Sequence, residues 1–322
     1  MKELSQKLEH AYGFTIQEMK LVQSSGDNDT YRIMTDNGLF FGRLSKRKNK
    51  DSVEIDLELG FLKYLKESHL PVAGVILTKS GENFAYIEDM PVVVFEWIDG
   101  NKFTVSPGKY LFREKVYDAG RALAIFHNVS ATYTGERTFN RTLTMELERV
   151  IGIQDDISKK YSNGDEFVGI VTRMIEFARE YSSQKHIVIH NDFRPQNVLF
   201  GSSEKNKDAI VGIVDFDWMC LAPPAKDLAL ALVEWSFADG ESAADFGSLE
   251  FFLKGYVEGI DERYCPNASD LSRWIEYACL SDTATYIADS VSEEKERGAF
   301  DTSQTKELKS YMFSKARYFK SI

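Results

Sequence analysis

The sequence has 322 residues, of which 43% are hydrophobic and 28% are charged, values typical of a globular protein rather than of a disordered or rod-like chain. The formal net charge of −11 argues against binding to duplex nucleic acid or to anionic membranes, because both need a basic surface. Three scattered cysteines are too few for a disulfide framework. Without a signal-peptide-like start or a long apolar run, a soluble cytoplasmic protein is expected.

The first part of the chain has the pattern of strands with two helices. Asn37-Gly38 is a strong signal for a tight hairpin turn between two strands. Apolar residues recur at every fourth position from Val53 to Leu65, which predicts a helix that ends before Pro71. The predicted elements are helices at 2–12 and 52–68 and strands at 14–23, 31–35, 39–44, 84–88 and 92–97.

Beyond Asp99-Gly100-Asn101, which is predicted to form a turn, the pattern becomes mainly helical. Two short apolar runs, 187–189 and 212–214, predict small buried strands. A β-rich front followed by a helical remainder indicates an α+β class with two lobes, and we expect domains at 1–98 and 99–322. Helices are predicted at 108–129, 144–160, 166–182, 225–238, 243–259, 268–291 and 304–319.

Two polar segments follow the short apolar runs and contain the residues best suited to chemistry. His190-Asn191-Asp192 leads to Asn197, and Asp215-Phe216-Asp217 begins 23 residues after Asp192. Carboxylate and carboxamide oxygens are hard ligands that suit Mg²⁺, which also binds phosphate oxygens. A carboxylate outside the metal shell, such as Asp192, could orient a hydroxyl and accept its proton. Phosphoryl transfer needs this combination of groups.

These segments resemble the catalytic and metal-binding loops of the aminoglycoside phosphotransferase and choline kinase-like superfamily, small-molecule kinases with the protein-kinase fold. Protein kinases have His-Arg-Asp-(x)4-Asn and Asp-Phe-Gly at these places, and Asp217 in place of glycine points to the small-molecule branch. The resemblance covers about residues 20–235, and its layout is most similar to homoserine kinase type II-like bacterial proteins. It implies a bilobal α+β fold with a small β-rich N-lobe and a large, mainly helical C-lobe.

The resemblance also implies a role for each matching residue. The catalytic residues would be Asp192, Asn197 and Asp215, with Asp192 acting on the acceptor hydroxyl. Mg²⁺ would be held by Asn197 and Asp215, with assistance from Asp217. ATP is the implied phosphate donor, and GTP stays open as an alternative. The implied nucleotide contacts are Ser25, Gly26 and Asn28 in the loop between the first strands, Arg43 paired with Glu58, and the hinge at Glu96 and Ile98.

Several residues have more than one interpretation. Arg43 stands at the strand position where a phosphate-contacting lysine is expected, and Lys46 is the alternative. His190 and His127 are interpreted as structural, and Asp227 as a helix cap or loop brace. The acidic residues Glu234 and Asp282 would either bind an amine of the acceptor or lie on a solvated helix face.

We therefore expect an ATP- and Mg²⁺-dependent phosphotransferase that acts on a hydroxyl of a small molecule, such as an amino alcohol, an amino acid like homoserine, or an aminoglycoside. Protein substrates are disfavoured because no Ala-Pro-Glu-type segment follows residue 217. The alternative is a catalytically silent nucleotide-binding protein that acts as a sensor or scaffold. A metal-dependent hydrolase would need more histidines than the five that the chain has. The acceptor and the oligomeric state are left open.

Overall fold

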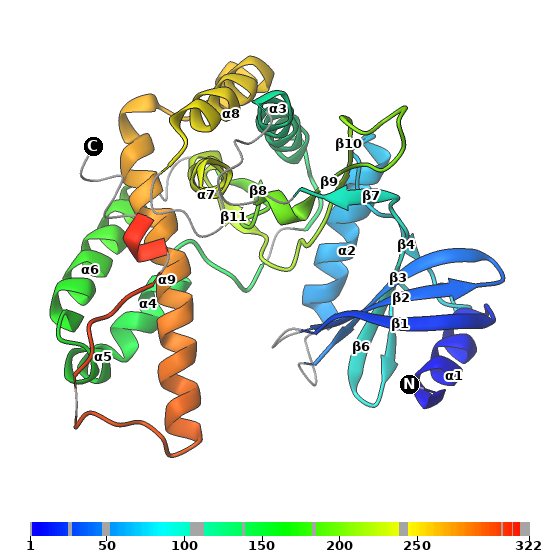
Figure 1. Ribbon diagram of the computed structural model, residues 1–322, viewed down its shortest axis with the longest axis horizontal. Coiled ribbons are helices and arrows are strands. Elements are labelled where there is room, and N and C mark those ends of the chain that lie inside the picture. The colour runs from blue at the N-terminus through cyan, green and yellow to red at the C-terminus, as the bar shows by residue number, and fades with distance from the viewer. Residues whose placement is uncertain are drawn as a thin grey trace. The chain divides into compact units, whose positions relative to one another are not determined.

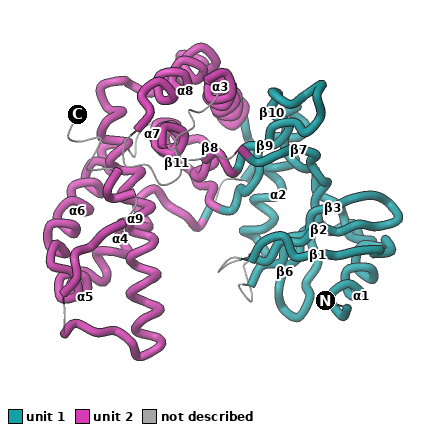
Figure 2. Tube along the Cα trace, in the orientation of Figure 1, with its two compact units in different colours: residues 1–102, 133–139, 197–217 teal, residues 103–132, 140–196, 218–322 magenta. Residues whose placement is uncertain are grey.

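The computed structural model describes residues 2–24, 28–46, 52–103, 113–136, 139–181, 185–237, 244–303, 305–310 and 312–315. The chain forms two compact units that alternate along the sequence (Figure 2). Unit 1 comprises residues 1–102, 133–139 and 197–217, and unit 2 comprises residues 103–132, 140–196 and 218–322. The division of the chain into functional lobes at residues 98 and 99 stays a prediction.

Unit 1 is built on an antiparallel sheet (Figure 1). Its strand order is β1-β2-β3-β6-β4, and β5 also pairs with β6. The predicted hairpin turn is present, since Thr35 pairs with Gly38, whose φ of +124° favours glycine. The bounds are β1 (Ile16–Ser24), β2 (Asn28–Thr35), β3 (Gly38–Ser45), β4 (Val75–Ile76), β5 (Ala85–Ile87) and β6 (Met90–Glu96).

Two helices belong to the same unit, α1 (Lys2–Tyr12) and α2 (Ser52–Glu67). In α1, Leu8 and Tyr12 are buried in the core of the unit, and the Tyr12 hydroxyl donates a hydrogen bond of 2.8 Å to the Val92 carbonyl oxygen. In α2, Glu58 lies on the buried face together with Leu62, because residues four apart share one side of a helix. A buried carboxylate needs a partner of opposite charge.

A second, smaller sheet of unit 1 has the order β10-β9-β7. The predicted turn at Asp99-Gly100-Asn101 is wrong for Gly100 and Asn101, which belong to strand β7. A Cβ at Gly100 would lie 3.0 Å from the Leu199 Cβ on the neighbouring strand β9 and 2.7 Å from a methyl group of Val211 on β10, so the tight packing here favours glycine. The bounds are β7 (Gly100–Lys102), β9 (Val198–Gly201) and β10 (Ile210–Ile213).

Unit 2 is mainly helical (Figure 1). Helix α7 packs against α8 and α9, and α3 packs along α8. A two-stranded antiparallel ladder of β8 (Ile187–Ile189) and β11 (Cys220–Ala222) is fully buried except at Leu221. The helices are α3 (Arg113–Ser130), α4 (Met145–Gly152), α5 (Gln154–Lys160), α6 (Gly164–Glu180), α7 (Pro224–Ser236), α8 (Phe246–Gly259) and α9 (Leu271–Glu296), and the 3-10 turns are Pro195–Asn197, Glu262–Tyr264 and Ala268–Asp270.

The helix predicted at 144–160 is two helices in the structure. Helix α4 ends before Ile153, whose φ of −123° is not helical, and α5 begins after it. The apolar periodicity of the segment continues across the break because both helices bury one face, Val150 in α4 and Ile157 in α5. The prediction of one continuous helix is therefore wrong.

The helix predicted at 304–319 is also wrong over much of its described length. Residues 305–310 are not helical, and a helical turn covers residues 312–315. Tertiary hydrogen bonds satisfy the backbone here instead: the N–H of Leu308 donates to the Asn163 side chain at 2.7 Å, and the N–H of Lys306 donates to the Lys160 carbonyl at 3.1 Å. Such contacts override local helix propensity.

In the described part of the chain, no helix has both the length and the apolar character needed to cross a membrane. The three cysteines, Cys220, Cys265 and Cys279, are all free thiols.

Helices α3 and α8 meet at two glycines. A Cβ at Gly255 would lie 2.0 Å from the carbonyl oxygen of Tyr117, and a Cβ at Gly120 would lie 2.1 Å from that of Phe252. Because these are backbone atoms, no side-chain rotation can relieve the clash, and the two helices would have to separate.

Gly255→Ala is expected to destabilise unit 2 by about 1–3 kcal/mol, the usual cost of overpacking a core. Gly169→Ala in α6 is the matched control, since the nearest atom is the end of the Arg173 side chain at 3.8 Å. The control should be neutral or stabilising by up to about 1 kcal/mol, because alanine favours helices. Urea denaturation followed by circular dichroism measures both, and equal stabilities of the two variants would contradict the prediction.

Candidate active site

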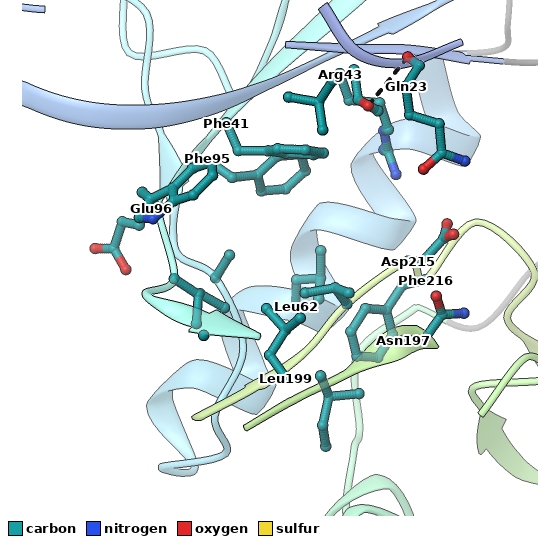
Figure 3. Close-up of a pocket in the computed structure, with 18 of the residues that line it drawn as sticks. Gln23, Phe41, Arg43, Leu62, Phe95, Glu96, Asn197, Leu199, Asp215 and Phe216 are labelled. Carbon is teal, nitrogen blue, oxygen red and sulfur yellow. Dashed lines mark hydrogen bonds between the residues drawn. The ribbon is translucent and has the colours of Figure 1, made fainter. Parts of the chain in front are cut away.

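Unit 1 contains a cavity of about 270 Å³ with one apolar and one polar end (Figure 3). Its apolar wall comes from β3, β6, β9 and α2 and consists of Phe41, Phe95, Leu62 and Leu199. Its polar end includes Asn28, Arg43, Glu58, Asn197 and Asp215. A cavity of this kind suits a ligand that joins a flat ring to a charged group.

Arg43 is the central cation of the polar end. Its guanidinium is buried and makes a two-pronged ion pair with Glu58, at 2.7 Å from Nη1 and 2.9 Å from Nη2. It makes a second ion pair with Asp217. Burial opposes the charge, but Asp217 and Glu58 outweigh it and raise the pKa of Arg43, so the side chain stays charged. The pair with Glu58 that the sequence predicts is therefore present.

Lys46, the alternative to Arg43, has other partners. Its ammonium lies 2.8 Å from Asp29 and 2.7 Å from the Ser24 hydroxyl. Arg43 belongs to the cavity lining and Lys46 does not. The geometry favours Arg43 as the phosphate contact, although the contact itself stays a prediction.

Asn197 and Asp215 come from adjacent strand ends. The backbone N–H of Val214 donates to the carbonyl oxygen of Asn197 at 3.0 Å, which sets the two segments side by side. Figure 3 shows both side chains on the side of the cavity opposite Glu96. Asp215 has a φ of +70°, in the left-handed region that most residues with a Cβ avoid but that aspartate and asparagine adopt more readily.

The oxygen donors at this end fit a divalent cation. The carboxylates of Asp217, Glu58 and Asp215 all act on the single guanidinium of Arg43, which leaves an excess of negative charge. Hard oxygen ligands with excess negative charge suit Mg²⁺. Among the described residues, no three His, Cys, Asp or Glu side chains form a metal site by themselves. A cation here would therefore use Asn197, Asp215 and oxygens of a bound ligand.

Asp217 is engaged more closely than the sequence suggests. Its carboxylate accepts from Arg43 and, at 2.5 Å, from the side-chain amide of Asn28. It thus connects the first residue of β2 with the segment that follows Asp215. Ser25 and Gly26, the other predicted contacts in the loop before β2, lie outside the described residues.

Glu96 and Ile98, the predicted hinge residues, lie at the other end of the cavity lining. The Glu96 carboxylate points away from the cavity (Figure 3) and accepts from Lys66 at 2.9 Å and from the Gly74 N–H at 3.1 Å. Lys66 lowers the pKa of this carboxyl, with help from the Gly74 N–H. The Glu96 side chain therefore stabilises β6 from outside the cavity.

Asp192 lies in unit 2, on the loop that follows β8. Its carboxylate is 12% exposed and accepts from Arg194, whose Nε lies 2.5 Å away. Arg194 is the more exposed partner, with 35% of its side chain accessible. The ion pair with Arg194 fixes the direction of this carboxylate.

The loop is held by Asp227, in the first turn of α7. Its carboxylate accepts from the backbone N–H of His190 at 2.9 Å and from that of Asn191 at 2.8 Å. It also bonds to Nε2 of His127 at 3.0 Å. Burial alone would raise the pKa of Asp227, but these histidines lower it, so it stays ionised. The interpretation of Asp227 as a loop brace is confirmed.

Both histidines of this region are structural in their contacts. His127 is fully buried, and its Nδ1 bonds to the Tyr256 hydroxyl at 2.8 Å. The His190 ring is fully buried and packs edge-on against Phe126 and Phe193. Neither ring is exposed to a ligand, which agrees with the structural interpretation.

Two parts of the site were not predicted from the sequence. They are the cavity wall at Phe41 and the contacts of Lys66 and Gly74 with Glu96. Phe41 could have been found, because alternate residues of a strand share a face and Arg43 lies two positions later. Lys66 and Gly74 have no local signal, since their role depends on Glu96, which is far away in the sequence.

Comparison with known proteins identifies the family. The model of the phosphotransferase enzyme family, APH, matches residues 18–262, about three quarters of the chain. The chain belongs to this family. A homoserine kinase of Parvibaculum lavamentivorans is 27% identical over 232 residues, with 70% of this chain and 67% of that protein covered. A homoserine kinase of Beijerinckia indica is 21% identical over 240 residues, with 74% and 70% covered.

Solved structures show the same fold. An amicoumacin kinase in complex with AMP-PNP and Ca²⁺ has a TM-score of 0.71 at 13% identity, with 99% of this chain and 92% of that chain covered. A microcompartment-associated aminopropanol kinase has a TM-score of 0.64 at 20% identity, with 94% and 100% covered. The predicted α+β class with a protein-kinase-like fold is confirmed, as is the interpretation of the protein as a small-molecule kinase.

Proposed function

We propose that the protein transfers the γ-phosphate of ATP, with Mg²⁺, to a hydroxyl of a small amine-bearing molecule. The observation that carries the proposal is the polar end of the cavity. One buried guanidinium and an excess of carboxylates lie beside an apolar wall, which matches a nucleotide phosphate chain with its divalent cation. Asp192, on the loop that leads to Asn197, adds a carboxylate suited to a hydroxyl acceptor.

In this proposal the nucleotide base packs against Phe41 and Phe95, next to the backbone of Glu96 and Ile98. Arg43, fixed by Glu58, binds the phosphates through a planar cation that can grip two oxygens at once. Ser25, Gly26 and Asn28 add contacts from the loop. The choice of ATP over GTP rests on the family resemblance.

Asn197 and Asp215 hold Mg²⁺, with Asp217 as a further oxygen donor. Bound there, the ion neutralises the charge that develops on the phosphates. Since Asp217 is bonded to Arg43 and Asn28, it would exchange one of these partners for the ion.

Asp192 orients the acceptor hydroxyl and takes its proton as the oxygen bonds to the γ-phosphorus. The bond between that phosphorus and the bridging oxygen of ADP breaks, and ADP leaves. Positioning and charge neutralisation supply most of the rate in such a reaction. The names of the relatives support an amine-bearing acceptor, because homoserine and aminopropanol each join an amine to a hydroxyl.

The first test is ADP release with ATP and Mg²⁺ over homoserine, 3-aminopropan-1-ol, ethanolamine, choline and spectinomycin, each compared with a reaction lacking acceptor. We expect at least one amine-bearing alcohol to stimulate release. ATP that raises the melting temperature without any acceptor-dependent release would support the silent sensor or scaffold instead. Phosphate release from phosphorylated compounds without ATP would favour the hydrolase.

A further inference from the structure

Helix α2 makes a contact at each end of the cavity in unit 1. Glu58, on the buried face of the helix, pairs with Arg43 at the polar end. Lys66 follows eight residues later in the last turn, about 12 Å along the helix axis. Its ammonium donates to the Glu96 carboxylate at 2.9 Å and to the Val72 carbonyl oxygen at 3.1 Å. Lys66 therefore joins the end of α2 to the predicted hinge.

Glu96 is held a second time by Gly74. The backbone N–H of Glu96 donates to the Gly74 carbonyl oxygen at 2.8 Å, and the Gly74 N–H donates back to the Glu96 carboxylate at 3.1 Å. A Cβ at Gly74 would lie 2.7 Å from the carbon of that carboxyl group and within 2.9 Å of both oxygens. Glycine at this position thus leaves room for the carboxylate outside the cavity (Figure 3).

The hinge needs such support because it follows the end of a strand. Glu96 is the last residue of β6, and the next three residues, 97–99, belong to no strand. Strand pairing starts again at β7, which pairs with β9. Ile98 lines the cavity within this span, so the direction of its backbone depends on how the two ends of the span are fixed. The contacts of Lys66 and Gly74 fix the first end.

The ion pair of Lys66 with Glu96 adds little stability by itself. The two side chains are 47% and 49% exposed, and water and salt screen such pairs. The arrangement instead supplies direction, since Lys66 and Gly74 together hold both the backbone and the side chain of Glu96. Lys66 is not among the described residues that line the cavity, so it acts on a ligand only through Glu96.

Resting on the proposed function, we propose that Lys66 and Gly74 are positioning residues for the nucleotide base. They hold Glu96 so that the backbone from Glu96 to Ile98 already faces the base when the nucleotide binds. Ordering of the hinge then costs less of the binding free energy. Because α2 also fixes Arg43, this one helix sets the spacing between the base end and the phosphate end of the site.

Calorimetry in the presence of Mg²⁺ with two probes, ATP and inorganic tripolyphosphate, separates the base end from the phosphate end. Lys66→Met removes the ammonium, and Gly74→Ala displaces the Glu96 carboxylate without changing any charge. We expect each variant to bind ATP about 5- to 30-fold more weakly, the cost of ordering one backbone residue on binding. Tripolyphosphate has no base and should bind both variants as it binds the wild type. Lys66→Arg, which keeps a cation here, should restore most of the ATP affinity.

Lys63→Met is the matched control. It removes an exposed ammonium from the same helix, 4.0 Å from Glu67, and should leave both affinities unchanged. Lys66→Met should melt at the wild-type temperature, whereas a purely structural role of Lys66 would lower the melting temperature. Unchanged ATP affinity in Lys66→Met, or an equal loss of affinity for ATP and tripolyphosphate, would overturn the proposal.

Binding and turnover together distinguish the positioning role from the proposed function. If ATP binding depends on Lys66 but no acceptor is phosphorylated, the proposed phosphoryl transfer fails and the positioning role stands. If acceptor-dependent ADP release has the same KM for ATP in the wild type and in Lys66→Met, the transfer stands and the positioning role fails. A wild type that binds no ATP would contradict both.

Discussion

Asp192→Ala is expected to lower kcat about 10³-fold, within the range of 10²–10⁴ that a positioned general base contributes. The KM for ATP should change little, because Asp192 belongs to unit 2 and every residue that lines the nucleotide-sized cavity belongs to unit 1. The variant should also fold. Its main structural effect is to free Arg194, which is exposed enough for water to hydrate it.

Steady-state kinetics with the best acceptor measures this effect, and a melting curve checks the fold. Asp155→Ala, which removes an exposed acid from α5, is the control and should retain wild-type rates. A tenfold or smaller loss of kcat in Asp192→Ala would contradict the role of Asp192 as base. A raised KM for ATP would instead place the carboxylate among the nucleotide contacts.

Asp215→Asn is the second large effect that we expect. Asparagine tolerates a positive φ at least as well as aspartate, so the backbone at +70° is kept and only the charge is removed. The loss of one carboxylate from the cation site should cost several kcal/mol of transition-state stabilisation, or about a 10³-fold lower kcat/KM. The Mg²⁺ concentration needed for half-maximal rate should also rise.

A Mg²⁺ titration at fixed ATP measures this shift in the wild type and the variant. Chelation of the divalent cations with EDTA should stop turnover in the wild type. Asp208→Asn is a suitable control, since Asp208 is an exposed acid of the loop between β9 and β10 and not part of the cavity lining. An unchanged Mg²⁺ dependence in Asp215→Asn would show that Asp215 is not a ligand of the ion.

Local signals were enough to predict the family and the fold class, while the roles of the candidate site residues stay predictions. Asp192, Asn197 and Asp215 stand at fixed spacings next to short apolar strands, so a short stretch of sequence indicates both the loop and its chemistry. Glu58 could be placed because helical periodicity sets it on the buried face with Leu62. The family, the fold class and the pair of Arg43 with Glu58 followed from these local patterns.

Features that depend on distant partners were missed or wrong. The strand at Gly100–Lys102 forms because β9, far along the chain, supplies its pairing partner. Residues 305–310 avoid the predicted helix because Asn163 and Lys160 satisfy their backbone groups. The bonds of Asp217 to Arg43 and Asn28 bridge more than 170 residues of sequence, beyond the reach of any local pattern.

The alternation of the two units along the chain has a consequence for synthesis on the ribosome. The sheet and α2 are complete once residue 102 has been made, but Asn197, Leu199 and Asp215 belong to the same unit and follow much later. At about 5–20 residues per second, the first segment waits roughly 6–23 s for them. During that interval the cavity wall formed by Phe41, Phe95 and Leu62 is incomplete, because Leu199 of β9 has not yet been made. Nascent-chain folding should therefore pass through a stage in which residues 1–102 are folded but unable to bind nucleotide. At that stage the segment depends on chaperones or on its own sheet to avoid aggregation.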